Sequence, residues 1–477
     1  MTDRTDSRKR WLCLYVLCAG VLMIVLDTTI VNVAMPSIRE DLHFGKSLVW
    51  VVNAYLLTFG GFLLLGGRLG DLFGQRRLFL LGITLFSLAS LACGMAGSQP
   101  ALIGARAVQG LGGAVVTAVA LSLIMNIFSE PGERAQAMGI YGFVCASGGS
   151  IGVLAGGFLT SSLNWHWVFL VNLPIGAVVF LLSLLLLPAG PGRSTSARLD
   201  FAGAATVTAS SMLAVYAIVN GNEAGWTSGQ TLGLLGAAVL LLALFLGIEA
   251  RVRDPLVPLA MFRLRNVATA NVVGVLWAAA MFAWFFISAL YMQLVLGYSA
   301  LQVGLAYLPA NLIMAAFSLG LSARLVMRFG IRRPLLAGLL LAAAGLALFA
   351  HAPVNGAFAA DVLPSMILLG LGAGMGFNPV LLAAMSDVAP SESGLASGLV
   401  NTSFMMGGAL GLAVLASLAT ARTDGLLASG AGSAVALTGG YHIAFGCGAV
   451  FAAVSSLMGA ALLRAGRPEA AGNQHGM

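Results

Sequence analysis

The stretch GGRLGDLFGQRR, residues 66–77, returns later in the chain as SARLVMRFGIRR, residues 322–333, with the same leucine, glycine and arginine-pair spacing. Two further matches have nearly the same offset: GLGGA at 110–114 against GLGAG at 370–374, and a Pro-x-Glu with spaced glycines at 131–152 and 390–411. Glycine-rich helices resemble one another by chance, but the arginine pair and the Pro-x-Glu spacing disfavour that alternative. The matches therefore predict two homologous halves.

The composition predicts a polytopic membrane protein. Of the 477 residues, 59% are hydrophobic and 9% are charged, against roughly 25% charged residues in a soluble domain. Apolar stretches of about 20 residues recur along the chain, and in lipid such spans must be helical because every backbone polar group needs an internal partner. We expect an all-α integral membrane protein with fourteen spans, at about 11–35, 47–66, 78–97, 101–127, 135–159, 167–188, 200–219, 230–249, 267–293, 301–326, 334–350, 362–387, 394–418 and 441–463.

The basic residues support this topology, because lysine and arginine accumulate in cytoplasmic loops. If both termini are cytoplasmic, the outer segments hold only Arg39, Lys46 and Arg422, and Arg106 lies inside a span. The remaining basic residues of the 24 fall in inner segments. The net charge of +7 is therefore a topological signal, and we expect a cell-membrane protein with no nucleic-acid partner.

The repeats and the span count together predict three segments. Residues 1–190 would form an N-terminal six-helix bundle, residues 191–266 two linkers and an inserted pair of helices, and residues 267–477 a C-terminal six-helix bundle. Two parallel repeats related by an axis along the membrane normal are typical of the major facilitator fold, which holds a central cavity between its halves.

Five motifs carry a family resemblance: LDTTIVNVAMPSI at 26–38, GGRLGDLFGQRR at 66–77, RAVQGLGG at 106–113, WHWVFLVNLPIG at 165–176 and LYMQLVLGYSALQVGLAYLP at 290–309. Together they resemble the fourteen-helix drug/proton antiporters of the EmrB/QacA type within the major facilitator superfamily, along nearly the whole chain. The resemblance implies proton-driven export of lipophilic, often cationic, compounds. It implies the proton as coupling ion, with no other cofactor or metal and no required oligomer.

One departure from that family lies in the fifth span. Its exporter signature combines spaced glycines with a proline, and here Gly148, Gly152, Gly156 and Gly157 are present while Val153 replaces the proline. We expect a glycine notch for close helix packing without the built-in kink. The direction of transport stays open at this point.

Asp27 is the candidate proton site. A carboxylate near the middle of a span costs roughly 2.5 to 3.5 kcal/mol on insertion scales, and the other acids, Asp200 and Glu249 among them, are expected at span ends or in loops that water or headgroups reach. Arg106 is the deep basic residue. Spans 1 and 4 both line the cavity of this fold, so the two side chains are expected to meet there or share a water. The pair either loads and unloads a proton during alternating access or forms a permanent tether.

The stretch 66–77 is a candidate conformational latch. Gly67 and Gly74 are expected to make the tight turn between spans 2 and 3, Asp71 to cap a helix or pair with a base, and Arg76 and Arg77 to anchor the next helix at the inner headgroups. A simple positive-inside anchor is the alternative interpretation.

Aromatic and amide side chains mark a candidate substrate cavity for a large lipophilic ligand, because apolar aromatic surfaces can repack around different compounds. The residues are Asn32, Tyr55, Gln109, Trp284, Phe285, Asn311, Asn378 and Asn401. The second half carries no deep acid, which favours neutral or monovalent substrates.

The sequence also allows functions other than drug export. A proton symporter or a lipid exporter of the same fold is the nearest alternative. A membrane enzyme or a scaffold is disfavoured, because the chain has no nucleophile triad, HExxH, paired-carboxylate or P-loop arrangement and a scaffold would not require Asp27.

Overall fold

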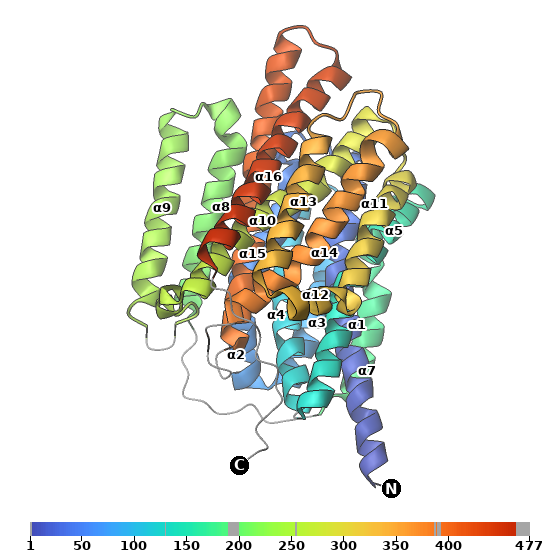
Figure 1. Cartoon of the computed structure of the whole chain (residues 1–477), viewed down its shortest axis with the longest axis vertical. Coiled ribbons are helices and arrows are strands. Elements are labelled where there is room, and N and C mark those ends of the chain that lie inside the picture. Colours follow the sequence, from blue (N-terminus) through green and yellow to red (C-terminus); the bar gives the residue numbers. More distant parts are fainter. Residues whose placement is uncertain are drawn as a thin grey trace.

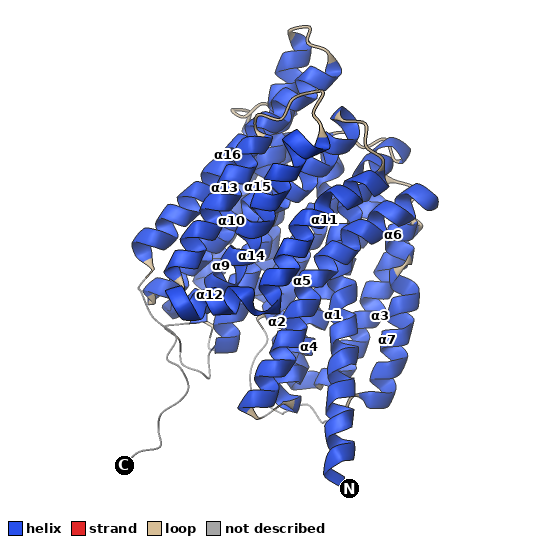
Figure 2. Ribbon diagram, turned by 45° about the vertical axis from the view of Figure 1, so that its right-hand side comes forward, coloured by secondary structure: helices blue, strands red, loops and turns tan. Residues whose placement is uncertain are grey.

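The computed structural model describes residues 2–128, 130–188, 200–252, 255–385, 388 and 393–463. These residues form helices joined by short loops, with no strand among them (Figure 2). The first half contains α1 (Thr2–Asp41), α2 (Trp50–Phe73), α3 (Gln75–Gly94), α4 (Gln99–Ile127), α5 (Pro131–Ser162), α6 (Trp167–Leu170) and α7 (Asn172–Leu186). Next come α8 (Phe201–Ala224) and α9 (Gly229–Glu249). The second half contains α10 (Arg265–Leu290), α11 (Ala300–Ala316), α12 (Ser322–Phe329), α13 (Arg332–Phe349), α14 (Leu363–Met385), α15 (Ser393–Ala428) and α16 (Ser433–Leu462).

The described residues include 12 helices long and apolar enough to cross a membrane. Two shorter apolar helices, Ile151–Ser162 within α5 and Ala300–Ala316, lie at two further predicted spans. The all-α membrane architecture is thus confirmed, while the count of fourteen spans stays a prediction.

The inserted helices α8 and α9 lie to one side of the main bundle. α8 and α9 pack against each other, and α8 also contacts α2 and α15, so the pair forms an antiparallel hairpin beside the main bundle (Figure 1). α1 begins and α16 ends toward the same end of the molecule (Figure 1). The inserted pair therefore contacts both halves through α8.

The turn between α2 and α3 is a single residue. α2 runs to Phe73 and α3 begins at Gln75, so Gly74 alone makes the turn, with φ 92° and ψ 121°. This left-handed backbone conformation favours glycine. The prediction that Gly67 shares in the turn was wrong: Gly67 lies inside α2, because that helix continues a further turn and a half toward Gly74.

Glycines of α5 lie against the backbone of α1. A Cβ at Gly152 would lie 2.8 Å from the Leu26 carbonyl oxygen, and one at Gly156 would lie 2.5 Å from that of Ile30. Gly157 faces α11 instead, where a Cβ would lie 2.7 Å from the Ala300 carbonyl oxygen. α5 is one continuous helix. Its glycine face thus packs against α1 within the first half and against α11 across the halves.

We expect Gly156→Ala to destabilise the protein by about 1–3 kcal/mol, because the new methyl group meets a backbone carbonyl that cannot rotate away. Gly149→Ala on the same helix is the matched control, since its Cβ would meet only a methyl group of Thr29 at 3.9 Å. Thermal unfolding in detergent measures both variants. Equal melting temperatures would contradict the close packing of α5 on α1.

Candidate functional site

Asp27 is fully buried and accepts three hydrogen bonds from side chains of α4 and α7. Its Oδ2 accepts from Nη1 of Arg106 at 2.5 Å. Its Oδ1 accepts from Nε2 of Gln109 at 2.7 Å and from Nδ2 of Asn172 at 2.9 Å. Each carboxylate oxygen is therefore satisfied by at least one donor, as a buried charge requires.

Arg106 has acceptors besides Asp27. Its Nε donates to the Val51 carbonyl oxygen of α2 at 2.8 Å, and its Nη1 also donates to Oε1 of Gln109 at 2.7 Å. The guanidinium carbon lies 4.3 Å from the centre of the Tyr55 ring, a cation–π distance. The arginine is thus held in place by contacts that do not depend on the charge of Asp27.

Two residues of α3 complete the network. Ser90 Oγ accepts from Nε2 of Gln109 at 2.7 Å and from Nδ2 of Asn172 at 3.1 Å. The Cys93 thiol donates to Oε1 of Gln109 at 3.6 Å. Both amide side chains therefore donate to Asp27 and to Ser90, which fixes their orientation.

The network lies inside the first half. Its side chains and carbonyl groups come from α1, α2, α3, α4 and α7. The expectation that Asp27 and Arg106 meet is confirmed, and α1 is rotated so that Asp27 faces α4 and α7. That the pair lines the cavity between the halves stays a prediction. Packing on α5 explains this rotation, because Leu26 and Ile30 of α1 face the glycines of α5.

Sequence reasoning missed Ser90, Asn172 and Cys93. Asn172 lies within the motif at 165–176, which offered a signal, whereas a serine and a cysteine inside apolar spans offer none. Tyr55 and Gln109, predicted to line the substrate cavity, belong instead to the surroundings of Asp27.

The remaining predicted cavity residues are spread over the molecule. Asn32 is buried and donates to the Thr28 carbonyl oxygen of its own helix. Trp284 and Phe285 are buried against Tyr307 of α11, with ring centres 6.1 and 5.5 Å from that of the tyrosine. Asn311 is buried on α11, and Asn378 is half-buried on α14. Whether these side chains line one cavity is not decided by their contacts, and the substrate cavity stays a prediction.

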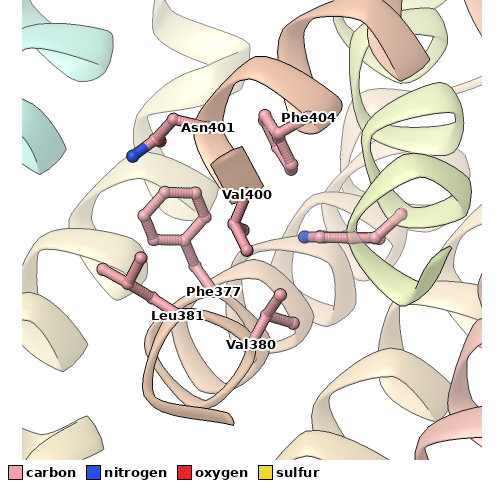
Figure 3. A pocket seen from close by; sticks show the side chains of 7 residues that line it. Phe377, Val380, Leu381, Val400, Asn401 and Phe404 are labelled. Atoms are coloured by element: carbon pink, nitrogen blue, oxygen red, sulfur yellow. The ribbon is translucent and has the colours of Figure 1, made fainter. Parts of the chain in front are cut away.

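Asn401 lines a small, mostly apolar pocket between α14 and α15, with a cavity volume of about 10 Å³. Figure 3 shows Phe377, Val380 and Leu381 on one side and Val400, Asn401 and Phe404 on the other. The indole of Trp277 also lines it, and the indole N–H finds no hydrogen-bond partner among the described residues. The pocket thus combines a mostly apolar lining with the Trp277 indole N–H and the Asn401 amide group.

The candidate latch contacts two neighbouring helices. Gln75 Nε2 donates to Ser122 Oγ of α4 at 2.6 Å. Arg76 Nη2 of α3 donates to the Leu184 carbonyl oxygen of α7, whereas Arg77 is exposed. Gly74 is the N-cap residue of α3. The side chain of Asp71 lies outside the described part of the chain, and its pairing stays a prediction.

Two acids that were expected to be accessible are buried, which corrects the sequence interpretation. Asp200 and Glu249 are 4% and 3% exposed. Asp200 caps α8 by accepting from the Gly203 N–H at 2.7 Å, and Glu249 accepts from the Val257 N–H at 3.1 Å. Burial arises because the chain after α9 folds back over the ends of both helices, which hydropathy does not reveal.

Comparisons with known proteins agree with this architecture. A family profile described as Major Facilitator Superfamily matches residues 17–412. The chain is 40% identical to the puromycin resistance protein pur8 of Streptomyces alboniger, over 91% of this chain and 87% of that protein. It is 38% identical to the cephamycin export protein CmcT of Amycolatopsis lactamdurans, over 86% of this chain and 85% of that protein. The lincomycin resistance protein of Streptomyces lincolnensis is 35% identical over 87% of this chain.

A solved structure shares the fold. The nucleoside transporter NupG, in its D323A mutant, superposes with a TM-score of 0.63 over 94% of this chain and 99% of that chain, at 13% identity. The similarity at this identity concerns the fold alone. With the profile match and the relatives, it establishes that the chain belongs to the major facilitator superfamily and is a multi-pass membrane transporter and not an enzyme.

Proposed function

We propose that the protein exports lipophilic compounds, antibiotics among them, from the cytoplasm by exchange with protons. Relatives named for antibiotic resistance or export support the class of substrate. The distribution of basic residues supports fourteen spans in the cell membrane with both termini cytoplasmic. The observation that carries the proposal is Asp27, a carboxyl group buried in a span with Arg106 on one oxygen and two amides on the other.

The hydrogen-bond pattern defines when Asp27 can take up a proton. Three N–H donors point at its two oxygens, which suits a carboxylate and leaves little room for a hydroxyl hydrogen. Protonation therefore requires that one donor moves away. Arg106 can do so without losing all its partners, because Val51 and Gln109 still accept from it.

α1 connects this exchange to the second half. Asp27 lies in the first bundle, and less than two turns further along α1 the Val33 carbonyl oxygen accepts from Nε2 of Gln293 at 3.0 Å. A shift of α1 on release of Arg106 would therefore change a contact between the halves. Alternating access in this fold is largely such a rocking of one bundle against the other.

Ion pairs between side chains also join the outer ends of the two halves. Lys46 Nζ lies 2.9 Å from a carboxylate oxygen of Asp424 and 3.5 Å from one of Glu223. At the separate contact between α5 and α11, the Leu301 N–H donates to Ser161 Oγ at 3.2 Å. These contacts link the first half, the inserted pair and the second half on one side of the membrane, so we take them as a closure of the outer side that opens during export.

One proton is energetically sufficient for useful export. A charge that crosses 100 mV releases roughly 2.3 kcal/mol, and about 1.4 kcal/mol corresponds to a tenfold concentration ratio. A single coupled proton thus sustains a substrate gradient of tens of fold.

A permanent tether between α1 and α4 is the second interpretation of the Asp27–Arg106 pair. Symport and lipid export are the other transport modes.

We expect expression in an efflux-deficient host to raise resistance to a subset of a panel of lipophilic antibiotics, and a protonophore to cancel the gain. Asp27→Asn should lose the gain because it cannot exchange a proton. Glu40→Gln, an exposed acid on the same helix, is the matched control and should retain it. Full resistance with Asp27→Asn, at equal protein in the membrane, would refute proton coupling at this residue.

Arg106→Met separates coupling from tethering. Alone it should destabilise the protein by about 3–5 kcal/mol, because it leaves a buried charge without its partner. Adding Asp27→Asn should restore thermal stability while proton-driven uptake into inverted vesicles stays absent. If the double variant recovers both stability and transport, the pair is a tether.

Lys46→Gln should open the outer side more often, by up to about fivefold, since a partly exposed ion pair contributes roughly 0.2–1 kcal/mol. The measurement is the rate at which an impermeant maleimide labels a cysteine placed at Val49, which is 3% exposed. Arg422→Gln, an exposed outer residue, is the control. Unchanged labelling in Lys46→Gln would count against the closure.

A further inference from the structure

A second apolar pocket lies between the inserted helices and the main bundle. Its walls come from α2, α8, α9, the connection after α9 and α15, and its cavity volume is about 170 Å³. Val207 near the start of α8 and Phe245 near the end of α9 both line it. These helix ends adjoin the basic connections, so the pocket belongs to the inner half of the membrane.

The pocket contains a polar group that needs a partner. Thr402 of α15 lines it, is only 8% exposed, and its Oγ1 finds no hydrogen-bond partner among the described residues. A buried hydroxyl group without a partner is unfavourable. Apolar walls with a few placed polar groups are typical of small-molecule pockets.

Part of the pocket's lining is exposed on the surface of the molecule, and part is held in place by a hydrogen bond. Leu246 and Phe262 line it and are 43% and 38% exposed. Val257, which also lines the pocket, is held through its backbone N–H, which donates to the buried Glu249. A molecule dissolved in the inner leaflet can therefore reach the pocket without crossing water.

The same stretch of α15 borders both pockets. Thr402 and Met406 face the pocket at the inserted helices, while Asn401 and Phe404 face the pocket on α14 (Figure 3). Since residues one and two positions apart point to different sides of a helix, α15 separates a membrane-side pocket from one inside the second bundle. Movement of this helix would connect the two.

We propose that the pocket at α8, α9 and α15 is an entry site, which loads a lipophilic compound carrying a hydrogen-bond acceptor directly from the inner leaflet. The acceptor bonds to the Thr402 hydroxyl group and the apolar body fills the remaining space. A phospholipid acyl chain would fill the space but leave that hydroxyl group without a partner. The inference rests on the proposed export of lipophilic compounds, and it assigns the inserted helices a role in capturing them.

The test uses a photoreactive derivative of rhodamine 6G, an amphiphile with an ester carbonyl group, on the full chain in nanodiscs without a proton gradient. We expect crosslinked peptides from α8, α9 and the start of α15. Thr402→Val should lower this labelling about threefold to tenfold, the size expected for one lost hydrogen bond. Leu246→Trp should lower it by filling the pocket, whereas Leu240→Trp, 71% exposed on the same helix, should not.

Absence of crosslinks in these peptides overturns the proposal, as does equal labelling in wild type, Thr402→Val and Leu246→Trp. Displacement of the probe by dioleoyl phosphatidylglycerol, with no effect of Thr402→Val, would assign the pocket to lipid and also overturn it. The experiment is independent of proton coupling, because Asp27→Asn should be labelled like wild type. If the pocket is labelled in a protein that confers no resistance, the proposed export function is contradicted, whereas the proposal of a binding site at this pocket is supported.

Discussion

The burial of Asp27 against Arg106 is the constraint on which the first half depends. Removing two charges from water costs several kcal/mol per ion, which is recovered only with good geometry and further hydrogen bonds. Here Gln109, Asn172 and Ser90 supply those bonds from three different helices. The pair therefore fixes the mutual positions of α1, α3, α4 and α7. A change in the charge of either partner must change how these helices pack.

α1 transmits such a change because it is packed differently on its two sides. Toward α4 and α7 it presents a polar network, and toward α5 it presents carbonyl groups that touch Gly152 and Gly156. Its outer part contacts Gln293 of the second half. A glycine face allows one helix to slide on another with few interlocking side chains. In our account, proton exchange at Asp27 thus displaces α1 along α5, while the inserted pair supplies substrate from the lipid side.

The sequence predicted the helical architecture and its most important residues because these depend on hydropathy and on the cost of charge in lipid. Asp27 and Arg106 were recognisable by depth alone. The direction in which their side chains point could not be predicted, because a helix that is apolar on every side does not reveal which face contacts which neighbouring helix. Ser90 and Cys93 carry no mark within an apolar span. The burial of Asp200 and Glu249 depends on a connection that folds back over helix ends, and the length of α2, which removes Gly67 from the turn, is not encoded in glycine content.

The central claim is that Asp27 changes protonation between transport states. Infrared difference spectroscopy on protein labelled with isotopic aspartate, in forms crosslinked with the outer side closed and with it open, observes the carboxyl group directly. The account predicts a protonated-carboxyl band that appears in one state, shifts with the isotope and is missing in Asp27→Asn. A carboxylate signal unchanged between both states would contradict it.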